Sequence, residues 1–314
     1  MTYSLITLSY NKFDCTRRCL SALLTDSVVD APWEMIVVDN GSTDGSSEWC
    51  DTELVALGAT CGVPVTVLHN PGNIGCSYAR NRAIAIARGD FLVFADNDIA
   101  PRTRRWMSTL RAALDSVPPA GMVGAKMVYP WPPYPIQCAG VGISQRGHVC
   151  FRGRGRPNDA PSFNRQETVQ CLISACLLIP AKLLKKHGSF DEAFHPVQFE
   201  DFDLVYRLRE AGYLAVYAPS AEMYHFESVT TQGTPTVRNP AVVVRNGLLF
   251  QKRWKHAFSK EKGPDEAACR WQKIDAPLST PSRVYPSCKH EKRVGEDHAF
   301  PGRQPFTLNA LTDV

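Results

Sequence analysis

Apolar runs and amphipathic stretches alternate along the first hundred residues. The apolar runs are short and rich in β-forming residues, whereas the stretches between them place apolar residues at a helical spacing. This alternation predicts strands at residues 4–8, 33–39, 63–69 and 91–95, separated by helices at residues 14–24, 44–57 and 74–88. Strands that alternate with helices form a parallel sheet covered on both faces, so we predict an α/β fold with a Rossmann-like central sheet.

Two residues mark the ends of predicted helices. Asp14 is suited to the N-cap of the first helix, because its carboxylate can accept hydrogen bonds from the free backbone N–H groups there. Gly89 follows the third helix, at a position where the left-handed conformation costs glycine little. We therefore expect the first helix to begin at Asp14 and the third to end just before Gly89.

The pattern is less regular after residue 100. It predicts a helix at 104–114, a strand at 121–129, an apolar strand region at 169–180, an acidic helix at 199–213 and a last amphipathic stretch at 239–255. Gly212 is expected to end the acidic helix. After about residue 257 the chain becomes polar and proline-containing, and we expect this tail to be either poorly ordered or an irregular wrap.

A polar cluster follows each strand that is predicted for the parallel sheet. The clusters are Ser9-Tyr10-Asn11, Asp39-Asn40-Gly41, Asn70-Pro71-Gly72-Asn73 and Asp96-Asn97-Asp98. Ligands of open α/β sheets bind outside the carboxyl ends of the strands. We therefore expect the four clusters to lie at one edge of the sheet and to form a binding site there.

Asp96 and Asp98 are the most informative pair among these residues. Two acids at positions i and i+2 of an extended segment point to the same side, and their charges repel unless a cation compensates. Mg²⁺ and Mn²⁺ prefer such oxygen ligands and commonly carry substrate phosphates. The alternative is a solvated polar turn, which would be the better interpretation of an isolated Asp-x-Asp. Its position after a central parallel strand favours the metal site.

Other polar residues suit a nucleotide. Asp39 could accept hydrogen bonds from a ribose or a base edge. The glycines of residues 71–84 precede a helix that begins near Arg80 and Arg82, which is an arrangement that binds phosphate. The segment lacks both the G-x-G-x-x-G pattern and the GK[ST] of a P-loop, so it does not indicate either of those folds.

Acidic residues also begin the predicted helix at 199–213. Glu200, Asp201 and Asp203 are favoured there by the helix dipole, and Asp203 could form a surface pair with Arg207. A carboxylate at this place could equally act as a general base. His225 follows a predicted strand and could bind a metal, although a lone histidine is more often structural.

Composition narrows the class of protein. The 314 residues suggest one large domain or two small ones, and the formal charge of +4 is too weak to argue for nucleic acid. We see no signal peptide and no apolar run long enough to cross a membrane, whereas contact with a membrane surface stays open. The eleven cysteines include no C-x-x-C pair. Reduced structural cysteines and a cytoplasmic location are therefore expected.

Several motifs in a fixed order resemble a known family. They are SYNK, VVDNGSTDGS, N-x-G-x-x-x-ARN and FADND in the first half, followed by FDEAF, EDFDLVYRLREAGY and YH. Together they resemble the inverting, nucleotide-sugar-dependent glycosyltransferases of family 2, which have the GT-A fold. The chain is most similar to the rhamnosyltransferase-like branch. The resemblance covers roughly Ser4 to Trp254, and the order of the motifs carries it rather than any single one.

The resemblance implies a role for each matching residue. Tyr10 would lie against the nucleobase, Asp39 would bind the base or ribose, and Asp96 would approach the nucleoside. Asp98 would ligate the divalent cation, Mn²⁺ or Mg²⁺, that bridges the diphosphate, with help from His225. Arg80 would contact the diphosphate. The catalytic pair would be Glu200 and Asp201, with Asp201 as the general base. Ser174 and Ala175 occupy the place of an acceptor loop, where Ser174 stands instead of the usual glycine.

The resemblance also implies a mechanism and a division of the chain. The base would deprotonate an acceptor, which would displace the nucleoside diphosphate in one inverting step. Residues 1–98 would form the nucleotide-sugar-binding half, and residues 99–256 a mixed acceptor-binding half that carries the base; residues 257–314 would be the tail. The acceptor could be a glycan, a lipid-linked glycan, a natural product or a peptide.

Two other functions and one segment stay open. A nucleotidyltransferase also uses acids and a metal on an α/β sheet, but usually carries an early glycine-rich signature with a lysine, whose glycines SYNKFDC lacks. A non-catalytic module that binds sugar nucleotides is the second alternative. The basic stretch from Arg146 to Arg156 is slightly better explained as a mobile, solvated loop than as a lid that attracts an anionic acceptor.

Overall fold

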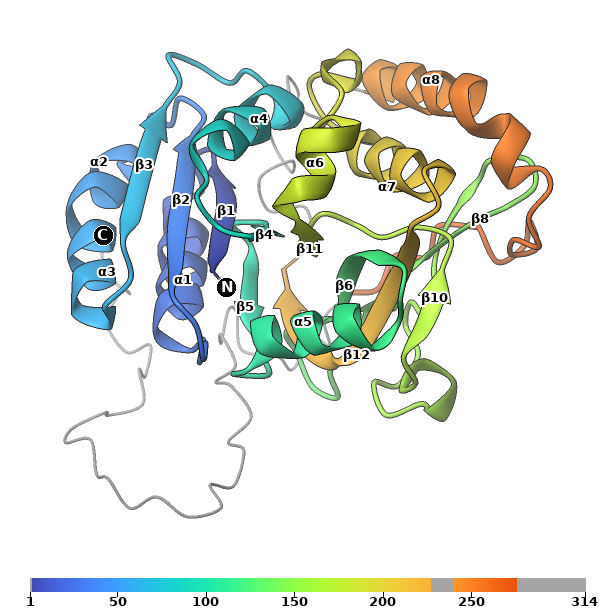
Figure 1. Cartoon of the computed structure of the whole chain (residues 1–314), viewed down its shortest axis with the longest axis horizontal. Helices are drawn as coiled ribbons and strands as arrows, with labels where there is room; N and C mark the ends of the chain where they lie inside the picture. The colour runs from blue at the N-terminus through green and yellow to red at the C-terminus, as the bar shows by residue number, and fades with distance from the viewer. Residues whose placement is uncertain (1, 227–239, 276–314) are drawn as a thin grey trace.

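The computed structural model describes residues 2–226 and 240–275 of the chain. Within these ranges a single sheet of ten strands forms the centre of the molecule (Figure 1). The four strands predicted for the first half are β1 (Tyr3–Ser9), β2 (Trp33–Asp39), β3 (Val65–His69) and β4 (Phe91–Ala95). They pair in parallel in the order β4-β1-β2-β3, which confirms the predicted Rossmann-like half.

The second half of the chain extends the same sheet beyond β4 with mixed strand directions. The strands here are β5 (Ile99–Pro101), β6 (Ala120–Val128), β7 (Ile136–Cys138), β10 (Glu167–Val169), β11 (Cys176–Pro180) and β12 (Leu214–His225). β11 lies between β4 and β6 and is antiparallel to both, whereas β12 runs parallel to β6. The fold is therefore α/β, with a parallel half and a mixed half joined in one sheet, as predicted.

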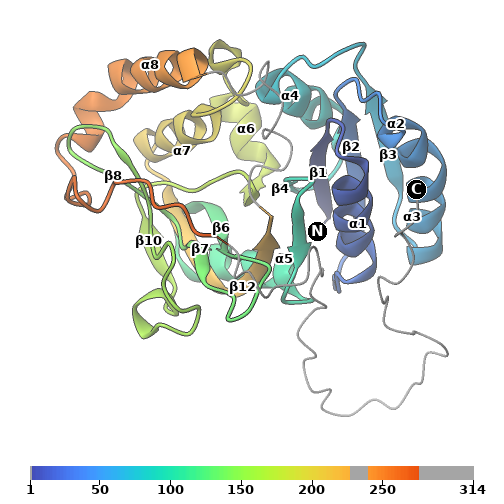
Figure 2. The ribbon, with the colours of Figure 1, turned by 180° about the vertical axis from the view of Figure 1, so that it is seen from behind.

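Helices cover the sheet on both faces. They are α1 (Phe13–Thr25), α2 (Ser46–Trp49), α3 (Val55–Cys61), α4 (Cys76–Ile86), α5 (Trp106–Ser116), α6 (Ala181–His187), α7 (Glu200–Glu210) and α8 (Pro240–Phe258). α1 and α3 lie on one face of the parallel half, and α4 packs against β1 and β2 on the opposite face (Figure 1, Figure 2). α7 packs against β6, β12 and α8. This packing fixes the start of α7 near the end of β12.

Several local predictions were wrong in their detail. Lys12, in a left-handed conformation, caps α1, and Asp14 lies in its first turn. The helix predicted at 44–57 is α2 and α3 with one π-helical turn between them, and the strand region at 169–180 is β10 and β11 with a loop between them.

α4 ends at Ile86, and Gly89 does not have a positive φ. A Cβ at Gly89 would lie 2.4 Å from the backbone nitrogen of Ser4, so the close contact with β1 requires glycine here. Gly212, at φ +92°, follows α7 as predicted.

The basic stretch from Arg146 to Arg156 is more regular than the solvated loop that was expected, although Arg146 and Arg156 are exposed. It contains β9 (Val149–Phe151), which pairs with β8 (Val141–Ile143) in a hairpin. Arg152 donates to Glu167 at 2.6 Å and to the carbonyl of Ala139 at 3.1 Å. Its guanidinium is therefore paired with groups of the protein itself.

Residues 259–275 lie against this hairpin as an irregular segment, which is one of the two forms expected for the tail. The rest of the tail, residues 276–314, lies outside the described residues. None of the helices in the described ranges is long and apolar enough to cross a membrane. The cysteines in the same ranges are all free thiols.

Candidate active site

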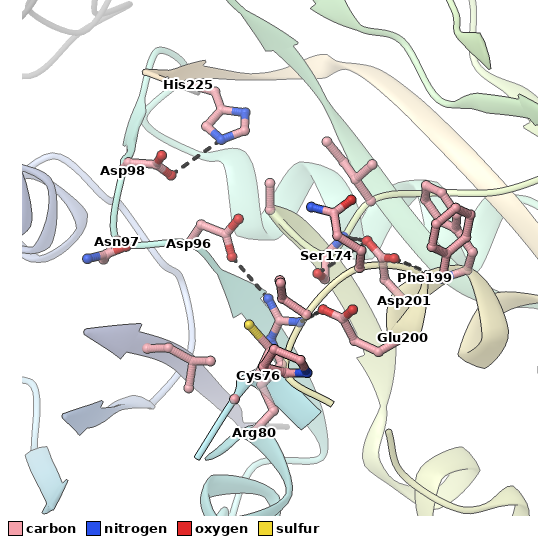
Figure 3. Close-up of a pocket in the computed structure, with 18 of the residues that line it drawn as sticks. Cys76, Arg80, Asp96, Asn97, Asp98, Ser174, Phe199, Glu200, Asp201 and His225 are labelled. Atoms are coloured by element: carbon pink, nitrogen blue, oxygen red, sulfur yellow. Dashed lines mark hydrogen bonds and ion pairs between the residues drawn. The ribbon is translucent and has the colours of Figure 1, made fainter. Parts of the chain in front are cut away.

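A pocket of about 410 Å³ opens at the carboxyl ends of β1, β2 and β4 (Figure 3). Pockets of this size are typical for small-molecule ligands. The polar side chains that line it include those of Ser9, Tyr10, Asn40, Asn73, Arg80, Asp96, Asn97, Asp98, Gln137, Ser174, Glu200, Asp201 and His225. The four strand-end clusters therefore meet at one edge of the sheet, and the acids of α7 face them across the pocket.

Asp96, Asp98 and His225 form a group that could hold a metal ion. One ligand atom from each lies within 4.8 Å of the others, and Nε2 of His225 is 3.3 Å from Oδ1 of Asp98. The backbone N–H of Phe226 donates to the carbonyl of Asp98 at 2.9 Å, which ties the end of β12 to the turn after β4. Two carboxylates and an imidazole are a donor set that Mn²⁺ accepts, so these residues fit a divalent cation.

The two acids are brought together by a turn, which corrects the expectation of an extended segment. Residues 97–98 form a turn between β4 and β5. The side chain of Asn97 lies in the interior and donates to the hydroxyl of Thr16 on α1 at 2.8 Å. This hydrogen bond anchors the turn, which explains why an amide stands between the two acids.

Gln137 on β7 orients His225 and was missed in the sequence. Its Oε1 lies 2.5 Å from Nδ1 of His225, and both side chains are buried. An amide oxygen can only accept a hydrogen bond, so in this arrangement Nδ1–H of His225 donates to Gln137. In the neutral imidazole the lone pair is then on Nε2, which faces Asp98. No local pattern marks Gln137, because β7 is a strand of three residues that is defined only by its pairing with β6.

Arg80 on α4 lies between two acids of the pocket. Its guanidinium donates to Asp96 at 3.1 Å and to Glu200 at 3.0 Å, and the residue is 5% exposed. The ring of Phe190 lies against the guanidinium, 5.1 Å from centroid to Cζ. Arg80 therefore joins the turn after β4 to the start of α7 in addition to lining the pocket.

Glu200 and Asp201 begin α7 after Phe199, whose φ of +72° turns the chain sharply into the helix. Burial, reinforced by the charge of Asp201, raises the pKa of Glu200 to about 7, and the Arg80 charge acts in the opposite direction. Oε2 of Glu200 has no hydrogen-bond partner in the described part of the chain. Burial also raises the pKa of Asp201, although hydrogen bonds to its carboxylate work against this. Raised values bring both acids nearer to the range of proton transfer at neutral pH.

Ser174 and Ala175, the residues predicted for an acceptor loop, line the pocket together with Glu200 and Asp201. The backbone N–H of Ser174 donates to Oδ2 of Asp201 at 3.0 Å, and its hydroxyl lies 3.4 Å from the same oxygen. The carbonyl of Ala175 accepts a hydrogen bond from the backbone N–H of Asp96 at 3.1 Å. The loop before β11 thus forms hydrogen bonds both to the turn that carries Asp96 and to the carboxylate of Asp201 on α7.

The strand ends on the other side of the pocket are organised by asparagines. Asn40 donates to Asn73 at 3.0 Å and accepts from Asn70 at 2.8 Å, and it lines the pocket with Tyr10. Asp39 is not among the lining residues. Its Oδ2 accepts from the backbone N–H of Ser42 at 3.1 Å, and its buried Oδ1 has no partner within the described residues. The sequence placed both residues in a strand-end cluster, but it predicted a binding role for Asp39 and none for Asn40.

Asp203 serves the fold rather than the pocket. Its carboxylate accepts from Arg207 at 2.9 Å, from Arg253 at 3.1 Å and from the indole of Trp254 at 2.9 Å. The pair with Arg207 was expected as a surface contact, but Asp203 is 1% exposed because α8 covers it. These bonds lock α7 against α8 and so fix the helix that carries Glu200 and Asp201.

Solved structures with the same architecture are glycosyltransferases of the GT-A fold. The structure of GalNAc-T7 with UDP, GalNAc and Mn2+ matches with a TM-score of 0.65 at 14% identity, over 82% of this chain and 49% of that one. The mannosyltransferase PcManGT from Pyrobaculum calidifontis, in complex with GDP-Man and Mn2+, matches with a TM-score of 0.52 at 20% identity, over 83% and 65% of the two chains. The fold is therefore GT-A.

The sequence places the chain in a family of this fold. The model of the family described as glycosyl transferase family 2 matches residues 4–188, and the chain belongs to this family. Its relatives include the uncharacterized protein y4gI of Sinorhizobium fredii, 32% identical over 72% of this chain and 25% of that protein. The pre-mycofactocin glycosyltransferase of Mycobacterium tuberculosis is 31% identical over 61% of this chain and 37% of that protein.

A third relative matches over most of its own length. The N-acetylglucosaminyl-diphospho-decaprenol L-rhamnosyltransferase of Mycobacterium tuberculosis is 28% identical over 73% of this chain and 78% of that protein. By contrast, the chain spans only a quarter of y4gI and 37% of the pre-mycofactocin glycosyltransferase.

Proposed function

We propose that the chain is a metal-dependent, inverting glycosyltransferase that moves a sugar from a nucleoside-diphosphate-sugar to an acceptor hydroxyl. One observation carries the proposal. The metal-ligand group of Asp96, Asp98 and His225 and the carboxylate pair of Glu200 and Asp201 line the same pocket, at the carboxyl ends of the parallel strands, in a member of glycosyl transferase family 2.

The donor would bind along the strand ends. Tyr10 lines the pocket next to the end of β1 and would lie against the nucleobase. The unpartnered buried oxygen of Asp39 supports a role in accepting a hydrogen bond from the base or ribose, since such an atom costs free energy unless a partner covers it. Asp96 would approach the nucleoside diphosphate from the turn after β4, and Arg80 would hold that carboxylate in place from behind.

Asp98 and His225, with Asp96 beside them, would hold the divalent cation, Mn²⁺ or Mg²⁺. When bound, such a cation neutralises the charge that develops on the diphosphate leaving group. The hydrogen bond from His225 to Gln137 supports this role, because it orients the imidazole with Nε2 toward Asp98, the nitrogen through which a neutral imidazole in this tautomer binds a metal. The structures of GalNAc-T7 and PcManGT are described with Mn2+, which supports the same assignment here.

Asp201 would act as the general base. Its Oδ2 is oriented by Ser174 and its Oδ1 by the backbone N–H of Phe202 at 2.9 Å. The carboxylate would take the proton of the acceptor hydroxyl while the acceptor oxygen forms a bond to the anomeric carbon. The bond from that carbon to the diphosphate breaks in the same step, and its electron pair leaves with the nucleoside diphosphate. One displacement of this kind inverts the anomeric configuration.

The acceptor, the location and the division of the chain remain part of the proposal. The names of the mycobacterial relatives include a lipid diphosphate and pre-mycofactocin, which supports a lipid-linked glycan, a natural product or a peptide as acceptor, besides a glycan. Residues 1–98 would bind the donor, residues 99–256 would supply the acceptor side and the base, and the protein would act in the cytoplasm.

A donor screen tests the proposal. UDP-, GDP- and dTDP-sugars are each added with Mn²⁺, and the melting temperature and the nucleotide product are recorded. We expect one donor class to raise the melting temperature, because ligand that binds only the native state stabilises it, and to release the nucleoside diphosphate. Release of pyrophosphate would indicate a nucleotidyltransferase instead, and binding without cleavage above background would indicate a non-catalytic module.

A further inference from the structure

The segment of residues 259–275, here called the C-terminal wrap, is held firmly on the acceptor-side half. Glu261 accepts hydrogen bonds from Arg209 on α7 at 2.8 Å and from Gln170 at 2.7 Å. The thiol of Cys150 on β9 donates to the carbonyl of Ala268 at 3.2 Å. A segment with this many partners along its length is part of the folded structure, so its side chains have defined places.

Trp271 of the C-terminal wrap lines the same pocket as the metal-ligand group and Asp201. It is 59% exposed, although large aromatic side chains usually bury most of their surface. The indole lies edge-on to the ring of Phe151 on β9, with the centroids 5.6 Å apart, and Phe151 lines the pocket as well. Two aromatic rings thus stand in the pocket wall, beyond the strand ends where the donor would bind.

Arg154 fixes the orientation of this indole. Its guanidinium lies 3.8 Å from the centroid of the Trp271 ring, which is a close cation–π contact. Its Nε donates to the carbonyl of Gln272 at 2.7 Å. The ring of Trp271 is therefore held from the hairpin by a charged partner and by the backbone next to it, and its position does not depend on a ligand.

We propose that Trp271 and Phe151 form an acceptor subsite that binds the apolar face of a pyranose ring. A pyranose has one face made of C–H groups and an edge of hydroxyls, and a fixed indole offers a flat apolar surface with polar groups at its rim. The guanidinium of Arg154 covers one face of the indole, so the pyranose would pack against the opposite face. Asp201 in the same pocket would then meet a hydroxyl of the bound sugar. The inference rests on the proposed function and gives the acceptor a chemical class: a sugar or a molecule that ends in one.

The subsite is tested by comparing Trp271→Phe, Trp271→Leu and Trp271→Ala with the wild-type protein. Methyl glycosides of glucose, N-acetylglucosamine, galactose and rhamnose serve as probes in saturation-transfer NMR with Mn²⁺ and UDP, GDP or dTDP present. We expect at least one glycoside to bind the wild type. Loss of the stacking contact in the Leu and Ala variants should weaken that binding about tenfold, whereas Phe should keep it within about threefold.

Three results would overturn the subsite. They are the absence of binding of every methyl glycoside to the wild type, equal binding by all variants, and full binding by Trp271→Leu. The last result would show that any apolar side chain suffices, as for a lipid chain. Leu248→Ala is the control, because Leu248 is an exposed apolar residue of α8 that does not line the pocket, and this variant should bind as the wild type does.

The rate at which water hydrolyses the donor, measured without an acceptor, distinguishes a failure of the subsite from a failure of the proposed function. Trp271 lies on the acceptor side, so its variants should release nucleoside diphosphate from the donor within about twofold of the wild-type rate; a larger fall would count against a role confined to the acceptor. If the wild type cleaves no donor at all, the proposed function fails. If it cleaves the donor but Trp271 has no effect on glycoside binding, only the subsite fails.

Discussion

Nε2 of His225 lies 3.3 Å from Oδ1 of Asp98, which joins the end of β12 to the turn after β4. The two residues meet because β5, which begins directly after Asp98, pairs antiparallel with β12 and places Ile99 opposite His225. The side chain of Gln137 contacts the other ring nitrogen, Nδ1, and so orients the imidazole with Nε2 toward Asp98. This arrangement leads to a first prediction about Gln137, which is not one of the proposed metal ligands.

Gln137→Leu should weaken the binding of Mn²⁺ by about 10- to 100-fold, the range found when an outer-shell partner of a metal-binding histidine is lost. The imidazole would lose the acceptor that fixes its tautomer. Titration calorimetry with MnCl₂ and a nucleoside diphosphate measures the affinity. Gln145→Leu replaces an exposed glutamine of the β8–β9 hairpin and should leave the affinity unchanged. Equal affinities of the two variants would exclude this role for Gln137.

Asp201→Asn should lower the turnover of the donor and acceptor by about 10²- to 10⁴-fold, because the amide cannot take a proton from the acceptor. Donor binding should persist, since Asp201 is proposed to face the acceptor rather than the donor. Melting temperatures with nucleoside diphosphate and Mn²⁺ measure the binding, and nucleotide release measures turnover. Asp159→Asn, at an exposed position, is the matched control. Near-normal turnover in Asp201→Asn would remove Asp201 from the role of base.

Arg80→Met should lower the free energy of unfolding by about 3–5 kcal/mol, because it leaves the buried carboxylate of Glu200 and the half-buried carboxylate of Asp96 without their partner. The double variant Arg80→Met, Glu200→Gln should recover part of this loss. Urea unfolding measures both. Arg82→Met changes an exposed arginine of the same helix and should cost clearly less. If the two single variants were equally stable, the contacts of Arg80 would not matter to the fold.

Glu200 should make the stability depend on pH. Burial raises its pKa from 4.5 to about 7, so the folded chain holds this proton more tightly than the unfolded chain does. Its contribution to the free energy of unfolding is complete below pH 4.5 and is lost as the pH rises through 7. Glu200→Gln should therefore resemble the wild type at pH 5 and exceed its stability by about 1–3 kcal/mol at pH 8.

Urea unfolding of the metal-free proteins at pH 5 and pH 8 checks this behaviour. Glu48→Gln, a change of an exposed glutamate, should follow the wild type at both values. A difference between wild type and Glu200→Gln that does not grow with pH would contradict the raised pKa.

The parallel half of the fold could be predicted closely from the sequence. β2 and β4 have the predicted bounds because both are buried on their two faces: β4 is apolar throughout, and β2 is apolar from Met35 to Val38. Because ligands of such sheets bind at the carboxyl ends of the strands, Asp98 and Tyr10 could then be predicted to line the pocket. The same rule could not distinguish Asp39 from Asn40, since which of two neighbouring side chains lines the pocket depends on the turn that follows the strand.

The mixed half could be predicted only in outline. β7, β9 and β10 are strands of only three residues, and they form by pairing with other segments of the chain. Three residues are too few to show the alternation of apolar and polar positions that predicts a strand. Gln137 and the aromatic pair of Phe151 and Trp271 were missed for this reason. Asp203 shows the same limit: its helical partner Arg207 was visible in the sequence, whereas its burial under α8 was not.

The most direct test of the central claim is proton NMR of the first turnovers of donor hydrolysis. The purified protein is given the donor selected by the screen, with Mn²⁺, and the anomeric signals are followed before the free sugar mutarotates. An α-linked donor should yield the nucleoside diphosphate and the β-sugar first, and a chelator should stop the reaction. First release of the α-sugar would contradict the single displacement through Asp201, and full activity in the chelator would contradict the metal site of Asp98 and His225.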